Sequence, residues 1–257
     1  MSETHYHLGF GAVDLGDDPP TLTFLSGDPN RARHIAENHL RHARTLSENR
    51  GLHAYSGELP NGRSVLSCTS GMGAPSMSIV VNELIQVGIE TVIRIGTSGS
   101  IQDHVKAGSV VVSSAGVVRQ GAGRDIAPEG YPAAADPFLT VALAEAATQL
   151  DVPHHVGLTA STDTFYEGQE RSASSANPTL LRHLRGLTDE LRDANVLNFE
   201  MEAATLFLMG QVYGFRAAAV CGIIAERTED EDIDLDAKAR AVDHAIQVAV
   251  TAAERFA

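Results

Sequence analysis

An arginine inside an apolar segment is the first placement in this chain that points to chemistry. Arg94 stands within the segment Ile93–Gly99 (IRIGTSG), whose first half reads as a buried strand. A buried charge without a partner is very costly, so Arg94 must meet an anion. The hydroxyls of Thr97 and Ser98 and the adjoining glycine N–H groups form an oxyanion cradle, although no Gly-Lys-Ser/Thr follows as in a P-loop. The anion is either a ligand or an internal carboxylate.

A second candidate anion site is the turn Leu25–Arg31 (LSGDPNR), directly after another predicted strand. Asp28 suits a helix N-cap and Pro29 suits the first helical turn. Gly27 lets the backbone approach an anion at that N-terminus, and Arg31 adds a positive charge within one turn. These residues predict phosphate binding, with a capped turn that binds nothing as the alternative.

A third cluster combines aromatic, amide and guanidinium groups in the segment 161–171 (STDTFYEGQER). Gln169 offers both a donor and an acceptor, whereas Arg171 offers donors only. Together they match the edge of a planar, amide-like heterocycle such as uracil, on which Phe165 or Tyr166 can stack. The alternative is a solvated polar loop.

Two acidic residues stand in the segment Asn198–Glu202, which we predict to begin an apolar helix. Glu200 and Glu202 are two positions apart and are therefore expected on different sides of that helix. A carboxylate here can bind sugar hydroxyls, or it can only offset the helix dipole. The glycine turn Ser70–Pro75 is weak evidence for dinucleotide binding, because the GxGxxG pattern fails at the next residue.

The charge balance excludes several partners. The chain of 257 residues has 33 acidic and 19 basic residues, a formal charge of −14 and 43% apolar residues. The acidic excess disfavours nucleic acid and anionic membranes. Only two of the basic residues are lysines, which favours a halophilic protein, because repulsion is screened within about 3 Å at 1 M salt. Ordinary acidic solubility is the alternative.

The sequence contains no motif that indicates a metal site, a membrane-spanning helix or secretion. No His/Cys/Asp/Glu spacing matches a known metal motif, so no metal is expected. Cys68 and Cys221 lie in apolar runs and are read as reduced core thiols. No apolar run of 18 residues and no signal peptide is visible, so we expect a cytoplasmic protein.

Short apolar runs alternate with helical patterns along the whole chain. This alternation predicts an α/β fold, a single domain over residues 1–257 with a central mixed β-sheet flanked by helices. Residues 119–137 are expected to form a loop that could act as a lid. The expected strands are Thr21–Leu25, Ser64–Thr69, Thr91–Ile95, Ser109–Ser113, Val156–Ala160 and Ala217–Ala225; the expected helices are Asn30–His39, Ser78–Val87, Phe138–Leu150, Thr179–Arg192, Glu200–Tyr213 and Asp236–Phe256.

Seven segments in register give the chain a family resemblance. In order they are His7–Gly9, Gly27–Arg31, Ser70–Ser76, Arg94–Thr97, Thr162–Arg171, Phe199–Glu202 and Glu226–Thr228. Together they resemble the nucleoside phosphorylase-I family, and Gly-Gln-Glu-Arg after Thr-Phe-Tyr is similar to its uridine-cleaving members. The resemblance implies reversible phosphorolysis of uridine to uracil and ribose 1-phosphate in pyrimidine salvage, without a cofactor and with inorganic phosphate as co-substrate.

The resemblance also implies roles for individual residues and an assembly. It implies a homo-oligomer, a hexamer built from dimers, in which a neighbouring subunit supplies His7 and Arg50. The implied phosphate ligands are Gly27, Arg31, Arg50, Arg94 and Thr97; the implied ribose ligands are His7, Met201 and Glu202, with Glu200 nearby; the implied base ligands are Phe165, Gln169 and Arg171, with Arg227 behind them; and the implied catalytic group is Arg94, Arg171, Gln169, Glu202 and Arg227.

Base choice follows from the segment after residue 217. Purine-cleaving members of the resembled family carry an acid at the position that corresponds here to Ile224. Without that acid the purine route is disfavoured, although Glu226 follows two positions later on the strand. A purine phosphorylase that uses Glu226 and a non-catalytic nucleoside-binding protein remain as alternatives. Gly51, after Arg50, replaces a glutamate linked in the family to a monovalent cation.

Overall fold

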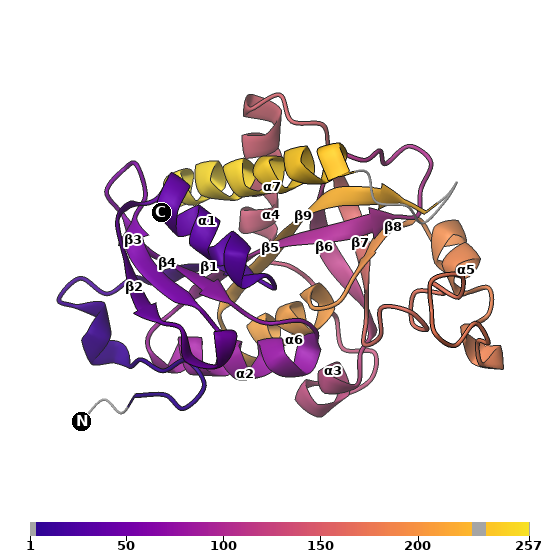
Figure 1. Cartoon of the computed structure of the whole chain (residues 1–257), viewed down its shortest axis with the longest axis horizontal. Helices are drawn as coiled ribbons and strands as arrows, with labels where there is room; N and C mark the ends of the chain where they lie inside the picture. The colour runs from indigo at the N-terminus through magenta and orange to yellow at the C-terminus, as the bar shows by residue number, and fades with distance from the viewer. Residues whose placement is uncertain (1–3, 228–234, 257) are drawn as a thin grey trace.

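The computed structural model describes residues 4–227 and 235–256 as an α/β fold built on one mixed sheet (Figure 1). The sheet has the strand order β2-β3-β4-β1-β5-β8-β7-β6-β9, with a further pairing between β5 and β9. The predicted fold class, a single α/β domain with a mixed sheet flanked by helices, is confirmed. The strands are β1 (Leu22–Ser26), β2 (Arg41–Ser47), β3 (Ala54–Glu58), β4 (Ser64–Thr69), β5 (Thr91–Ser100), β6 (Val110–Arg119), β7 (His154–Thr162), β8 (Val196–Glu200) and β9 (Arg216–Glu226).

Half of the sheet closes on itself. Strand β5 pairs with β8 on one side and with β9 on the other, and β8, β7, β6 and β9 pair in succession to complete a ring. Strand β1 lies parallel to β5 and joins the ring to the open half of the sheet. The carboxyl end of β1 therefore lies beside the middle of β5, because Leu25 pairs with Arg94 and β5 continues to Ser100. Ligands of α/β proteins commonly bind beyond the carboxyl ends of strands such as β1.

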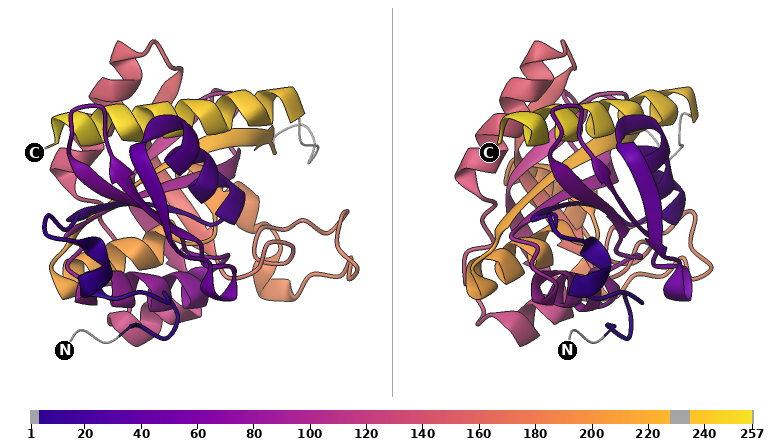
Figure 2. Two further views of the ribbon diagram at one scale, coloured as in Figure 1. Left: turned by 60° about the vertical axis from the view of Figure 1, so that its left-hand side comes forward. Right: turned by 90° about the vertical axis from the view of Figure 1, so that its left-hand side faces the viewer.

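Helices cover both faces of the sheet, as the three views in Figures 1 and 2 show. Helices α1, α4 and α7 contribute to one apolar core, and helices α2 and α6 contribute to a second core on the opposite side. The helices are α1 (Pro29–His39), α2 (Ala74–Gln86), α3 (Gly121–Ile126), α4 (Pro137–Gln149), α5 (Leu187–Asp193), α6 (Ala203–Tyr213) and α7 (Leu235–Arg255), with 3-10 turns at Ala12–Leu15, Asn49–Gly51 and Arg182–Leu184.

All six predicted strands are present, but three strands escaped prediction. Strand β2 is an exposed edge strand, so its residues lack an apolar alternation. Strand β8 is short and fully buried, and its apolar residues merge in the sequence with those of the helix that follows. For this reason the predicted helix Glu200–Tyr213 was wrong at its start: Glu200 ends a strand, and the helix begins at Ala203.

Two further segments differ from the sequence prediction. The predicted helix Thr179–Arg192 is helical only from Leu187, because Gly186 has a φ of +79° that interrupts the right-handed helix. The predicted loop 119–137 includes the helix α3, which packs on α6. In the part of the chain that the structure describes, no helix combines the length and apolarity needed to cross a membrane. Thr228, in the last resembled segment, lies outside the described residues.

Candidate active site

A cavity of about 520 Å³ opens at the carboxyl end of β1, beside the second half of β5. Its walls bring together parts of the chain that are far apart in the sequence: the turn after β1, the second half of β5, the loop after β7, and the junction of β8 with α6. The lining residues are Gly27, Asp28, Pro29, Arg31, Met72, Arg94, Thr97, Ser98, Gly99, Phe165, Gln169, Arg171, Phe199, Glu200, Met201, Glu202, Ile224, Ala225 and Lys238.

The turn after β1 contributes a helix N-terminus to this cavity. The Asp28 carboxylate accepts a hydrogen bond from the Asn30 backbone N–H at 2.9 Å and caps α1, as its residue type predicts. Gly27 lies close to the carbonyl oxygen of Gly71, so a Cβ at this position would come within 3.3 Å of that oxygen. The backbone of the turn therefore packs close to the glycine turn of Ser70–Pro75.

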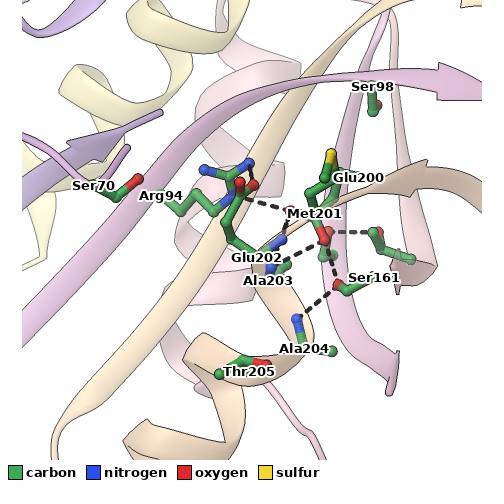
Figure 3. A network of polar contacts seen from close by, with 12 residues as sticks. Ser70, Arg94, Ser98, Ser161, Glu200, Met201, Glu202, Ala203, Ala204 and Thr205 are labelled. Carbon is green, nitrogen blue, oxygen red and sulfur yellow. Dashed lines mark hydrogen bonds and ion pairs between the residues drawn. The ribbon is translucent and has the colours of Figure 1, made fainter. Parts of the chain in front are cut away.

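Arg94 lies on β5 between two carboxylates from the β8–α6 junction (Figure 3). Its Nε donates to Glu200 Oε2 at 3.1 Å, and its Nη2 donates to Glu202 Oε2. All three side chains are buried. Arg94 thus forms the internal ion pair that its burial requires, and it also lines the cavity, so the interpretation of Arg94 as a ligand for an anion stays a prediction.

Arg31 brings a second guanidinium to the same end of the cavity. Its Nη1 donates to the carbonyl oxygen of Ile95 at 3.1 Å. Burial and the charge of Arg94 lower the pKa of Arg31 below its ordinary value. Burial also acts to lower the pKa of Arg94, but the attraction of Glu202 and Glu200 outweighs it and raises that pKa.

Each guanidinium retains donor capacity. Among the residues that the structure describes, neither Arg31 Nε nor Arg94 Nη1 has a hydrogen-bond partner, although both atoms are buried. Buried donors of this kind are normally satisfied, and a cationic pair that faces a cavity favours an anionic ligand. This end of the cavity is therefore suited to a phosphate group.

Glu202 lies beside this cationic end. Burial raises the pKa of Glu202, an effect that the charge of Arg94 opposes. The same carboxylate accepts a hydrogen bond from the Gly73 backbone N–H at 2.5 Å, which ties it to the glycine turn. Gly73 has a φ of +84°, a conformation that favours glycine. Glu202 and Met201 both line the cavity next to the arginines, where a bound sugar would offer hydroxyl groups.

Gln169 and Arg171 face the cavity from the loop after β7. Both are buried, and Arg171 Nε donates to Gln169 Oε1 at 3.4 Å, a long contact. The Gln169 amide nitrogen donates to Thr162 Oγ1 at 3.2 Å, which orients the amide. The Arg171 guanidinium carbon lies 4.3 Å from the ring centroid of Phe165, which is partly exposed. The cavity wall therefore has the planar polar groups of Gln169 and Arg171 next to the aromatic ring of Phe165.

Arg227 lies behind these residues and does not line the cavity. Its Nη2 donates to the backbone carbonyl of Gln169 at 2.5 Å, and its guanidinium lies over the Phe199 ring at 5.3 Å. Its contact with the Gln169 backbone supports the loop from behind.

His7 and Arg50 do not line the cavity of their own chain. His7 Nδ1 lies 2.6 Å from Glu83 Oε1. Burial acts to raise the pKa of Glu83, but hydrogen bonds from the His7 side chain and from the backbone of His7 and Leu8 outweigh it and lower that pKa. Arg50 has a φ of +56° and lies 5.7 Å from the centroid of the Tyr6 ring.

Of the residues that bear on base choice, two lie in the cavity wall and Glu226 lies outside the cavity. Ile224 and Ala225 line the cavity. Glu226 does not, because its carboxylate accepts hydrogen bonds from Lys106 Nζ and from the backbone N–H of Ala107, each at 2.8 Å. These bonds, that from Lys106 above all, lower the pKa of Glu226, so its carboxylate is a poor proton donor to a base.

Two residues at the cavity had no role in the sequence prediction. Lys238 reaches its wall from α7, and Met72 reaches it from the glycine turn. Lys238 is one of only two lysines in the chain, and this rarity was the only available signal. Within residues 4–227 and 235–256, no group of three or more His, Cys, Asp or Glu side chains is arranged to hold a metal ion.

Comparison with known proteins shows the family of the chain. Residues 21–257 match the family model of the phosphorylase superfamily. The chain belongs to the phosphorylase superfamily. This phosphorylase is 41% identical to the uridine phosphorylase of Escherichia coli strain K12, over 98% of the chain and 97% of that relative.

Two more distant relatives of this phosphorylase broaden the comparison. It is 38% identical to the uridine phosphorylase of Thermococcus kodakarensis, over 88% of the chain and 79% of the relative. It is 31% identical to the guanosine phosphorylase of Halorubrum lacusprofundi, over 91% of the chain and 93% of the relative.

Proposed function

We propose that this phosphorylase is a pentosyltransferase that catalyses the reversible phosphorolysis of uridine to uracil and ribose 1-phosphate. The observation that carries the proposal is the placement of two kinds of polar group along one cavity. Half-buried Arg31 lies with buried Arg94 and Glu202 at one end, and buried Gln169 and Arg171 lie on another wall. Several near full-length relatives named uridine phosphorylase support the same activity.

Phosphate takes the part of nucleophile in the proposed reaction. Gly27, Arg31, Arg94 and Thr97 hold it beneath the sugar, and its oxygen attacks the anomeric carbon as the bond to the base breaks. The negative charge of phosphate stabilises the positive charge that develops on the ribosyl ring, so no covalent enzyme intermediate is required. Rate then comes from positioning and from fixed charge.

The base leaves as an anion, and Gln169 and Arg171 stabilise it at the carbonyl edges of uracil. Phe165 stacks on the ring, and Arg227 holds the loop in place through the Gln169 carbonyl. Glu202 binds the ribose hydroxyls beside Met201. By analogy with an oxyanion hole, the loss of one donor to the departing base costs about 10²–10³ in turnover.

His7 and Arg50 enter the proposed site from a neighbouring subunit. Both lie away from the cavity of their own chain, which agrees with a homo-oligomer, a hexamer built from dimers, whose subunits share sites. A variant forced into the monomeric state is expected to lose activity. An active monomer would remove His7 and Arg50 from the site.

Four further properties complete the proposal. The enzyme needs no cofactor, and inorganic phosphate is its co-substrate. It acts in the cytoplasm in the salvage of pyrimidine nucleosides, and its domain spans residues 1–257. The charge of −14 with only two lysines favours halophily.

A purine substrate is the second candidate, because one relative is named guanosine phosphorylase. Ile224 stands at the cavity wall, where purine-cleaving members of the family carry an acid, and Glu226 is held outside by Lys106. These contacts favour uridine over guanosine.

A panel of nucleosides assayed with and without phosphate, at several salt concentrations, tests the proposal. We expect loss of uridine that depends on phosphate, and highest activity at molar salt. Cleavage of guanosine with uridine untouched would refute the roles given to Gln169 and Arg171. No phosphate-dependent loss of any nucleoside would favour a non-catalytic binding protein.

A further inference from the structure

We propose that Ser161 and Glu200 are positioning residues that set the orientation of Arg94 for phosphate. The inference rests on the proposed function only in that it takes phosphate as the ligand of Arg94. It gives a role to Ser161, to which the resemblance assigns none, and it makes Glu200 a holder of Arg94 instead of a sugar ligand.

Both oxygens of the Glu200 carboxylate accept hydrogen bonds from several protein donors (Figure 3). Its Oε2 accepts from Arg94 Nε at 3.1 Å, from the Glu202 N–H at 2.8 Å and from the Ala203 N–H at 2.9 Å. Its Oε1 accepts from the Ser161 hydroxyl and from the Ala203 N–H at 3.0 Å. The side chain is buried. A carboxylate with this number of donors has little capacity left for sugar hydroxyls.

Two of these donors, the N–H groups of Glu202 and Ala203, belong to the start of α6. The residue before that helix, Glu202, makes no side-chain cap, and the N–H groups of its first turn lack helical partners. Glu200, from the end of β8, and Ser161, from β7, supply the missing acceptors. A buried negative charge at a helix N-terminus is also favourable for the helix dipole. The carboxylate is therefore held by rigid backbone, and it holds the guanidinium in turn.

Ser161 is the link that prevents Glu200 from rotating. Its hydroxyl oxygen accepts a hydrogen bond from the Ala204 N–H at 2.9 Å, and the same hydroxyl donates a hydrogen bond to Glu200 Oε1. Ser161 is fully buried at the end of β7, which pairs with β8. One hydroxyl thus joins the strand, the helix start and the carboxylate into a single rigid unit.

This unit acts on phosphate through Arg94. With Nε held by Glu200 and Nη2 held by Glu202, the plane of the guanidinium is defined, and Nη1 is the buried donor without a partner among the described residues. Recognition of an anion by a guanidinium depends on the direction of its N–H groups. A looser Glu200 would let that plane turn and would weaken phosphate binding without removing any group from the cavity.

The test compares Ser161→Ala with Thr159→Val in the full-length protein. Thr159 is a matched control because it lies on the same strand and the same face. It also loses a buried hydroxyl, one that contacts Ser113 at 2.6 Å and Asn198 at 2.8 Å instead of Glu200. Ser161→Thr keeps the hydroxyl that Ser161→Ala removes, on the same carbon, and is therefore the rescue variant.

The first readout is the Kd for inorganic phosphate by titration calorimetry without nucleoside. We expect Ser161→Ala to raise this Kd about tenfold, which equals about 1.4 kcal/mol. Thr159→Val is expected to stay within about twofold of wild type, because its site acts independently of the phosphate site. Ser161→Thr is expected to stay within about twofold because it keeps the hydroxyl. Melting temperatures are expected to fall in both Ser161→Ala and Thr159→Val, so stability alone does not produce the difference.

The second readout is steady-state kinetics. We expect Ser161→Ala to raise the KM for phosphate and to leave the KM for uridine unchanged. An unchanged phosphate Kd in Ser161→Ala, an equal rise in Thr159→Val, or a wild-type protein that binds no phosphate would each overturn the inference. If the wild type fails to cleave uridine but Ser161→Ala still weakens phosphate binding, the proposed function fails and the inference stands.

Discussion

Replacing Arg94 by alanine removes the guanidinium that lies between two buried carboxylates. Glu200 and Glu202 are 3% and 4% exposed, so neither can turn to solvent without movement of the β8–α6 junction. Breaking a buried ion pair by removing one partner costs about 3–5 kcal/mol. For a domain of this size, about 2–4 °C are lost per kcal/mol, so we expect the melting temperature to fall by roughly 6–20 °C.

The pH dependence of this loss follows from Glu202. Burial already raises its pKa with Arg94 present, and the loss of the neighbouring positive charge raises it further. A carboxyl whose pKa is higher in the folded state than in the unfolded state binds more protons when folded, so stability falls as pH rises through the folded pKa. We expect the Arg94→Ala variant to lose melting temperature more steeply than wild type as pH rises above the ordinary carboxyl range.

Phosphorolysis by the same variant is measured as the change in ultraviolet absorbance when uridine is cleaved at saturating phosphate. We expect turnover to fall at least 10²–10³-fold, the estimated cost of one preorganised donor. Arg192→Ala is the control for loss of an arginine outside the cavity, because partly buried Arg192 pairs with exposed Asp189 and donates from Nε to the Ile101 carbonyl at 2.9 Å. Turnover within about tenfold of wild type would refute the assignment of Arg94 to phosphate.

Three further predictions concern residues other than Arg94. Arg171→Ala is expected to lower turnover of uridine about 10²–10³-fold in the same assay, and unchanged turnover would remove it from the base site. Glu226→Gln is expected to leave uridine turnover unchanged, because Lys106 holds that carboxylate outside the cavity; a large loss would revive the purine mechanism. Gly96→Ala is expected to lower the melting temperature, because its Cβ would meet Cys221 Sγ at 2.7 Å, and an unchanged melting curve would contradict that packing.

Much of the architecture was predictable because it depends on local patterns. Short apolar runs locate the six predicted strands, and the cap of α1 follows from Asp28 and Pro29 alone. The edge strand β2 was not predictable, since an exposed strand has no reason to alternate apolar and polar residues. The start of α6 was not predictable either, because Glu200 ends a strand and caps the next helix through its side chain.

The candidate site also has parts that the sequence could predict and parts that it could not. The burial of Arg94 in an apolar run was enough to predict that it meets an anion, whereas the identity of that anion depended on residues 106 and 108 positions away in the chain. Glu200 and Glu202 were expected on different sides of a helix. Instead both contact Arg94, because Glu200 is the last residue of a strand and Glu202 directly precedes the helix. The placement of Ser161 below Glu200 had no sequence signal, since a serine at a strand end is common.

The amino-acid sequence by itself determined which residues must be buried, which must be capped, and which charges must find a partner. These are properties of single side chains and short segments, and their energetics depend little on the rest of the chain. Only the tertiary structure decided which partners meet, because pairing of β5 with β8 and β9 brings distant segments into contact. That pairing, together with the pairing of β7 and β8, brings Arg94, Glu200 and Ser161 together. Contacts with Lys106 and Ala107 hold Glu226 outside the cavity.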